Sequence, residues 1–118
     1  NPSLYTKASL PIGRERRYFI TDGGVLCHHP YWPEDALRGK IAFRRWRKKL
    51  TELNHETSTE IRTLRLFSKW VETQCKGYWS VDWLYAHSQW WAIDMAPGEL
   101  SWHWPGCPKA KKPERSSL

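Results

Sequence analysis

The segment GYWSVDWLYAHSQWWAIDMAPGE, residues 77–99, is the most informative part of the sequence. Two runs, 78–85 and 90–95, are rich in aromatic and β-branched residues, and His-Ser-Gln at 87–89 separates them. Such runs with a two-residue period are typical of strands, and proline after the second run, at Pro97, is typical of a strand end. The stretch therefore predicts a β-hairpin.

Each predicted strand carries one aspartate, Asp82 in the first and Asp94 in the second. A turn centred on Ser88 pairs Ala86 with Trp90 and, further along, Asp82 with Asp94; directly opposed residues have Cβ atoms about 4.5–5.5 Å apart. Two carboxylates so placed repel unless a positive group lies between them, and Mg²⁺ favours such a pair together with phosphate oxygens. Two alternatives stay open: a bulge changes the register, or basic neighbours satisfy each aspartate separately.

A second hairpin is predicted upstream. RRYFI at 16–20 and VLCHH at 25–29 flank Thr-Asp-Gly-Gly, and an Asp-Gly turn between β-prone runs is a strong hairpin signal. Pro30 ends the second strand.

Two helices are predicted between the hairpins. The first, between Pro33 and Asn54, is indicated by an apolar stripe at helical spacing, formed by Leu37, Ile41, Trp46, Leu50 and Leu53. The second begins at the capping box of Thr57 and Glu60 and ends at Lys76-Gly77. The predicted fold is α+β, an antiparallel sheet from two β-hairpins with two helices on one face.

Residues 77–99 resemble the end of an ATP-grasp catalytic domain. In that superfamily one strand carries an acid, a turn follows, and the next strand carries a second acid within an apolar run. Asp82 and Asp94 match those positions in type and separation. The resemblance implies that both are metal ligands, and that the cofactors are Mg²⁺ and ATP.

The upstream stretch GRERRYFITDGGVLCHHPYW, residues 13–32, is also similar to an ATP-grasp segment. There a strand arginine, often in a Glu-x-Arg arrangement, supplies a phosphate-binding guanidinium. Glu15 and Arg17 match this arrangement, with Arg16 a less certain stand-in. The resemblance implies that Glu15 and Arg17 bind ATP and that Arg17 is the catalytic residue that steadies the transferred group.

The function so implied is that of part of an ATP-dependent and Mg-dependent ligase. Within the superfamily the chain most resembles a poorly characterised clade of bacteria and phages whose members are suspected RNA ligases. RNA, or a carboxylate and amine pair, is the implied substrate. We expect three parts in the chain: an extended lead-in (1–13) with little periodicity, the C-terminal subdomain of an ATP-grasp domain that the resemblance implies (14–107), and a basic flexible tail (108–118).

The chain departs from the family pattern. The asparagine expected two residues after the second acid is Ala96, so Glu99 or Ser101 substitutes or one metal is bound more weakly. The flexible loop and ATP-binding lysines of the superfamily lie N-terminal to this segment, and the chain begins at Asn1 rather than Met. We therefore expect a fragment that neither hydrolyses ATP nor ligates without its missing N-terminal half. A degenerate, non-catalytic remnant is an alternative.

The net charge of +7, from 19 basic against 12 acidic residues, favours an anionic partner. Much of the excess positive charge lies at residues 44–49 and 109–115. A small nucleic-acid-binding module is therefore the rival function. The plainer interpretation is a solvated helix face and a soluble tail. Base-stacking tryptophans would support the rival. Packing is favoured for all of them, with the apolar face of the hairpin holding Trp79, Trp83 and Trp91.

Three cysteines without a Cys-x-x-Cys pair indicate free thiols in a reducing compartment, and we expect a cytoplasmic protein. No run approaches the roughly 18–20 apolar residues of a membrane span, so no membrane partner is predicted. Cys27-His28-His29 and His103-x-x-x-Cys107 could supply soft ligands to zinc. Cys27 and His28 face opposite ways on a strand, however, so satisfied polar residues and a buried thiol are favoured.

Overall fold

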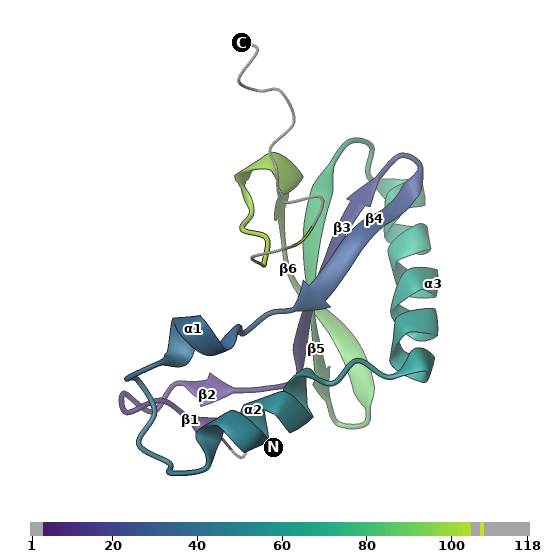
Figure 1. Ribbon diagram of the computed structural model, residues 1–118. Coiled ribbons are helices and arrows are strands. Elements are labelled where there is room, and N and C mark those ends of the chain that lie inside the picture. Colours follow the sequence, from purple (N-terminus) through teal and green to yellow (C-terminus); the bar gives the residue numbers. More distant parts are fainter. Residues whose placement is uncertain (1–3, 105–106, 108–118) are drawn as a thin grey trace.

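A four-stranded antiparallel sheet with strand order β4-β3-β5-β6 forms the centre of the computed structural model, which describes residues 4–104 and 107 (Figure 1). Two hairpins build the sheet, and the bounds of their strands are Glu15–Thr21 for β3, Gly24–Pro30 for β4, Trp79–Ala86 for β5 and Gln89–Pro97 for β6. The α+β class and both hairpins are confirmed.

The turn between β5 and β6 is shorter than predicted. It consists of His87 and Ser88, whose φ angles are 53° and 65°. A two-residue turn with positive φ at both positions follows the twist of the strands that it joins. As a result Ala86 pairs with Gln89, and the predicted pairing with Trp90 is wrong.

A β-bulge then restores the expected register. Between Asp82 and Trp83 the pairing shifts, so that Ile93 is the extra residue and Asp82 lies opposite Asp94. The residues between the turn and the bulge are displaced by one position. Trp91 therefore leaves the apolar face on which the sequence placed it, and it is 45% exposed.

Helix α3 (Ser58–Gln74) covers one face of the sheet at β3 and β4 (Figure 1). It begins where predicted, because the Thr57 side chain accepts a hydrogen bond from the Glu60 N–H at 3.0 Å. Its buried Leu64 joins a cluster of sheet residues formed by Tyr18, Ile20, Val81 and Trp83. The helix ends at Gln74, just before the predicted Lys76-Gly77 stop.

The first predicted helix is wrong as one continuous element. The chain forms a single turn, α1 (Glu34–Leu37), and a separate helix, α2 (Trp46–Asn54). Gly39 lies between them with a φ of +78°, a left-handed conformation that glycine adopts without strain and that a helix cannot contain.

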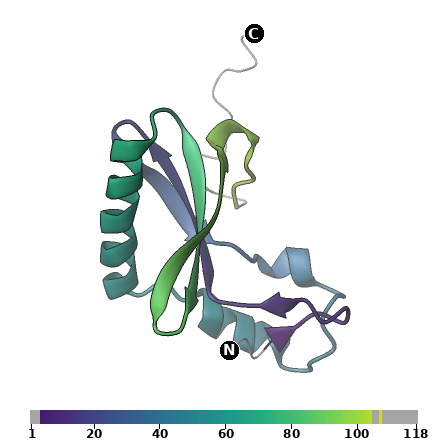
Figure 2. The ribbon, with the colours of Figure 1, turned by 180° about the vertical axis from the view of Figure 1, so that it is seen from behind.

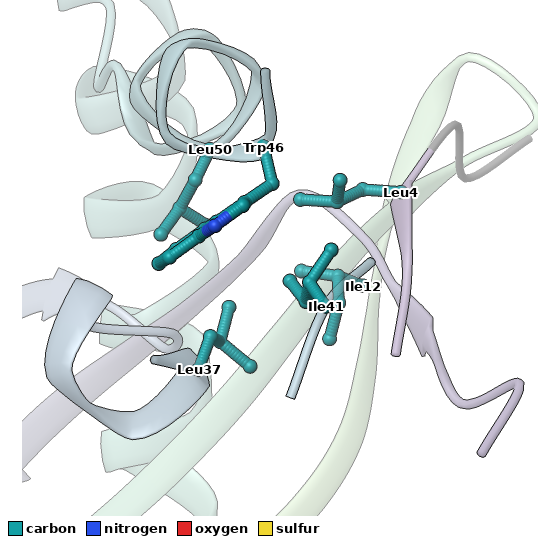
Figure 3. Packing of buried hydrophobic residues seen from close by; sticks show 6 residues of the cluster. All are labelled: Leu4, Ile12, Leu37, Ile41, Trp46 and Leu50. Atoms are coloured by element: carbon teal, nitrogen blue, oxygen red, sulfur yellow. The ribbon is translucent and has the colours of Figure 1, made fainter. Parts of the chain in front are cut away.

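The helices α1 and α2 pack on a second hydrophobic cluster instead of on the sheet. The cluster consists of Leu4, Ile12, Leu37, Ile41, Trp46 and Leu50 (Figure 3). The last four of these belong to the predicted five-residue apolar stripe. Leu4 and Ile12 come from two short paired strands, β1 (Leu4–Tyr5) and β2 (Pro11–Ile12), within the predicted extended lead-in. Among the described helices, α3 is therefore the one that covers the sheet, whereas two had been predicted to do so. The predicted tail at 108–118 lies outside the described residues.

The chain after β6 packs on the other face of the sheet. A short helix, η1 (Gly98–Leu100), and the residues after it lie on the side of the sheet away from α3 (Figure 2). Ser101 Oγ lies 2.6 Å from the Ser80 Oγ of β5, and the ring of His103 stacks on Phe19 of β3 with centroids 3.7 Å apart.

Candidate functional site

Three neighbouring strands bring Arg17, Asp82 and Asp94 into one row on the face opposite α3. Arg17 of β3 is the register partner of Asp82 of β5, and Asp82 is the partner of Asp94 of β6. Directly opposed residues of an antiparallel sheet share a face, and Glu15, two residues before Arg17, shares it as well. All four residues that the sequence singled out therefore lie on the same face.

Arg17 and Asp82 form a two-point ion pair. The Arg17 Nε and Nη2 donate to Asp82 Oδ1 and Oδ2 at 2.8 and 3.0 Å, and the two side chains are 13% and 6% exposed. Burial opposes the charge of Arg17, but the hydrogen bonds and charge of Asp82 outweigh it and raise the Arg17 pKa. The positive group beside Asp82 is thus the Arg17 guanidinium. For Asp82 this is the alternative in which a basic neighbour satisfies the aspartate.

Arg17 also borders a small hollow with aromatic walls. Its Nη1 donates to the Trp102 carbonyl oxygen at 3.1 Å, and its guanidinium carbon lies 4.9 Å from the centroid of the Tyr31 ring. The hollow measures about 250 Å³, and its lining is Arg17, His29, Tyr31, Trp32, Pro33, Ala36 and Trp102. Aromatic walls beside a cation suit a planar or anionic group. No role was predicted for Tyr31 and Trp32. Two aromatic residues directly after a predicted strand could have indicated a binding surface.

Glu15 supports the wall of this hollow. The Trp32 Nε1–H donates to Glu15 Oε2 at 2.9 Å. Burial raises the pKa of Glu15, the Trp32 hydrogen bond opposes that shift, and the charge of Asp82 adds to it. The contact fixes the Trp32 ring.

Asp94 is the exposed end of the row. Its Oδ1 accepts a hydrogen bond from the Met95 N–H at 2.9 Å. The charge of Asp94 also contributes to the raised pKa of Arg17, as expected for a carboxylate on the same face. Asp94 therefore combines solvent access with proximity to the ion pair.

Ala96, which replaces the family's asparagine, lies opposite Ser80. The Ser101 hydroxyl comes close to this position, because it lies 2.6 Å from Ser80 Oγ and donates to the Pro97 carbonyl oxygen at 3.1 Å. Of the two proposed substitutes for asparagine, Ser101 is thus buried and already hydrogen-bonded, whereas Glu99 is exposed on η1.

His29 is a buried neighbour on the same face. Its Nδ1 lies 2.7 Å from the Pro30 carbonyl oxygen, and its Nε2 accepts from the Trp104 N–H at 3.3 Å. Together the two contacts place the proton on Nδ1. Burial lowers the pKa of His29 to about 4, so the ring is neutral at pH 7.

One group in the described part of the chain offers three or more metal-ligating atoms within 4.8 Å of one another, and it consists of Cys27, His103 and Cys107. The acidic residues there form no such group. A hard cation at the Arg17 row would rely on Asp82 and Asp94, in keeping with the one or two carboxylates that Mg²⁺ commonly takes.

A wider hollow of about 570 Å³ lies between the start of α3 and the β5–β6 turn, lined by residues that include Thr57, Glu60, Phe67 and Trp90. The Glu60 carboxylate accepts hydrogen bonds from Arg16, so this hollow presents no unengaged acid.

Comparisons of the chain with protein-family models, with curated proteins and with solved structures give no match. Among the described residues, no helix is long and apolar enough to cross a bilayer. Any role for the Arg17 row therefore rests on its own geometry and chemistry.

Proposed function

We propose that this chain is the metal- and phosphate-binding half of an ATP-dependent ligase of the ATP-grasp type. The observation that carries the proposal is the row of Arg17, Asp82 and Asp94, presented by three adjacent strands on the face that α3 leaves uncovered. The guanidinium can donate hydrogen bonds to a phosphate group, and the two carboxylates can act as ligands for a divalent cation. The aromatic hollow beside Arg17 adds room for a planar or anionic group.

The row fits one hard cation. Each carboxylate oxygen has two lone pairs, so Asp82 can accept from Arg17 and still offer an electron pair to a metal. Asp94 is exposed and has one oxygen bound to a backbone N–H. Ala96 carries no ligand atom, and the Ser101 hydroxyl is engaged, which supports one ion rather than two.

In this function Mg²⁺–ATP supplies the reactive phosphate and the neutralisation of its charge. Asp82 holds the Arg17 guanidinium, and Tyr31 and the Trp102 carbonyl keep it at the rim of the hollow. From there Arg17 donates hydrogen bonds to the transferred group. Asp94 provides the accessible metal ligand.

The proposed ligase has further requirements. A second, N-terminal half must cover the phosphates, so this chain alone is expected to be inactive. The acceptor is RNA or a carboxylate and amine pair. The proposed location is the cytoplasm, because the three cysteines include no Cys-x-x-Cys pair.

Mn²⁺–ATP is expected to bind the chain, and Asp94→Asn is expected to weaken that binding at least about tenfold because a metal ligand is removed. Titration calorimetry measures the affinity, and ATP without metal shows the metal-dependent part. Glu52→Gln is the matched control, since Glu52 is also exposed but lies on α2, outside the row. Absence of Mn²⁺-dependent ATP binding in the parent, or equal losses in both variants, contradicts the proposal.

A second candidate function, binding of nucleic acid, is favoured by the region before and at the start of α2. Arg44, Arg45 and Lys48 are exposed there, and the ring of Phe43 beside them is 51% exposed. The neighbouring Arg47 is instead paired with Glu34 at 2.9 Å. Cations beside an exposed aromatic ring suit a phosphate backbone with a stacked base.

Reversing Arg44, Arg45 and Lys48 to glutamate is expected to weaken binding of single-stranded RNA. The slope of log K against log salt should become shallower by about 0.7 for each RNA phosphate that the variant no longer neutralises. Filter binding at several salt concentrations measures both effects. The same charge change at Arg62, Arg65 and Lys69, which are exposed on α3, is the control. Undetectable RNA binding by the parent at low salt, or an equal effect of both triple variants, removes this candidate.

A further inference from the structure

Cys27, His103 and Cys107 meet on the sheet face that carries the Arg17 row. Their potential ligand atoms, two Sγ atoms and a ring nitrogen, all lie within 4.8 Å of one another. His103 is buried, and both cysteines are half-buried. Cys27 belongs to β4, whereas the other two residues follow η1, so residues far apart in sequence converge here.

The fold explains this convergence. Cys27 is the register partner of Phe19 and shares its face of the sheet. The His103 ring stacks on Phe19 with an interplanar angle of 10°, which brings His103 beside Cys27. The Cys107 N–H donates to the carbonyl oxygen of Trp104, the residue after His103, at 3.2 Å, which keeps Cys107 near His103.

The donor set and its spacing suit zinc. Thiolate and imidazole are the ligands that Zn²⁺ prefers, and hard cations such as Mg²⁺ prefer oxygen. Tetrahedral Zn²⁺ with ordinary bond lengths separates its sulfur and nitrogen ligands by about 3.6–3.8 Å. Each pair of these atoms therefore needs to approach by at most about 1.2 Å to coordinate one ion.

We propose that Cys27, His103 and Cys107 bind one Zn²⁺ ion, with a water molecule as the fourth ligand. His29 is the nearby residue that could compete for the fourth position, but both of its ring nitrogens have partners, the Pro30 carbonyl and the Trp104 N–H. Binding deprotonates the two thiols and joins β4 to the segment after η1. This proposal does not depend on the ligase function.

Zinc binding also has a consequence for the Arg17 hollow. Trp102, the residue before the ligand His103, supplies both a wall of the hollow and the carbonyl that accepts from Arg17. An ion that anchors His103 to β4 therefore fixes Trp102 over the sheet. Loss of zinc is expected to loosen this wall and to lower the melting temperature.

The test uses the full 118-residue chain, purified with a reductant and without chelator. We expect about one zinc per chain by elemental analysis, and Co²⁺ added to the zinc-free chain should give thiolate-to-metal charge transfer and the visible bands of a tetrahedral site. Cys27→Ser and Cys107→Ser should each lower Co²⁺ affinity at least about 100-fold. Cys75→Ser is the matched control, because Cys75 caps α3 outside the cluster and should bind as the parent does.

The Co²⁺ spectrum of the parent keeps the test decisive even where a serine variant unfolds. A parent chain that holds no zinc and gives no charge-transfer band overturns the proposal. An equal loss of Co²⁺ binding in Cys75→Ser overturns it as well. So does a Cys27–Cys107 disulfide in protein prepared without oxygen, which would show that the two thiols serve each other instead of a metal.

Discussion

Replacement of Glu60 by alanine is expected to lower the free energy of unfolding by about 3–5 kcal/mol, because it leaves a buried cation without its counter-charge. The Arg16 side chain is fully buried, its Nε donates to Glu60 Oε2, and its Nη2 donates to Glu60 Oε1 at 3.2 Å. The guanidinium cannot lose its proton at any ordinary pH, so the variant must bury the charge or open to water.

The same arginine joins the two hydrophobic clusters. Its Nη2 also donates to the carbonyl oxygens of Leu53 and His55, each at 3.0 Å, at the end of α2. Glu60 lies in the first turn of α3, and Arg16 itself belongs to β3. Loss of Glu60 is therefore expected to loosen the junction of sheet, α2 and α3 together, and to leave a single cooperative transition at lower denaturant.

Chemical denaturation of Glu60→Ala and Glu56→Ala measures the effect. Glu56 is a close control, because it pairs with His28 at 2.8 Å but its side chain is 20% exposed. Water reaches this pair and screens it more than the fully buried Arg16 pair, so a smaller loss of stability is expected. Equal losses of stability in the two variants would show that the buried Arg16 contact has no special weight.

The Thr57 capping box illustrates what the sequence could and could not predict. The hydroxyl of Thr57 caps the Glu60 amide as the four-residue pattern requires. The Glu60 carboxylate does not return to the start of the helix; it binds Arg16, which is 44 positions away. A short pattern fixes a helix start, but it does not reveal a partner that tertiary folding supplies.

The pairing of Asp82 with Asp94 was predicted correctly, although the predicted β5–β6 turn was one residue too long. A three-residue turn and a regular ladder lead to the same Asp82–Asp94 partnership as the two-residue turn with a bulge at Ile93. Bulges leave little trace in a two-residue period, so the displacement of Trp91 to the other face could not be predicted.

The candidate sites required contacts between distant segments. The residue types of Arg17 and Asp82 were noticed, but their ion pair depends on the register of β3 with β5, strands that most of the chain separates. The spacing of His103 and Cys107 was also visible, yet their approach to Cys27 depends on the chain folding back over the sheet after η1 (Figure 2). Residue types and spacing indicate the candidate groups, and tertiary structure decides which of them meet.

Asp82→Asn and Asp94→Asn are expected to differ in stability, although the two residues face each other. Asp82→Asn should lower the free energy of unfolding by roughly 2–3 kcal/mol, because Arg17 loses the charged acceptor of two hydrogen bonds in a largely buried site. Asp94→Asn should change it by about 0.5 kcal/mol or less, because Asp94 is exposed and asparagine keeps an oxygen for the Met95 N–H. Denaturation in the presence of chelator measures both.

Mn²⁺–ATP then separates a metal-binding role of the row from a purely structural one. If Asp82 and Asp94 share an ion, Mn²⁺–ATP raises the melting temperature of the parent and has little effect on either variant, even though only Asp82→Asn is weakened in chelator. If the row is an ion pair and nothing more, the metal complex shifts none of the three proteins. Equal losses in chelator would contradict the assigned pairing, because Arg17 would then depend on Asp94 as much as on Asp82. The stability of Asp94→Asn in chelator is thus the measurement that identifies which aspartate holds the guanidinium and which is available to a cation.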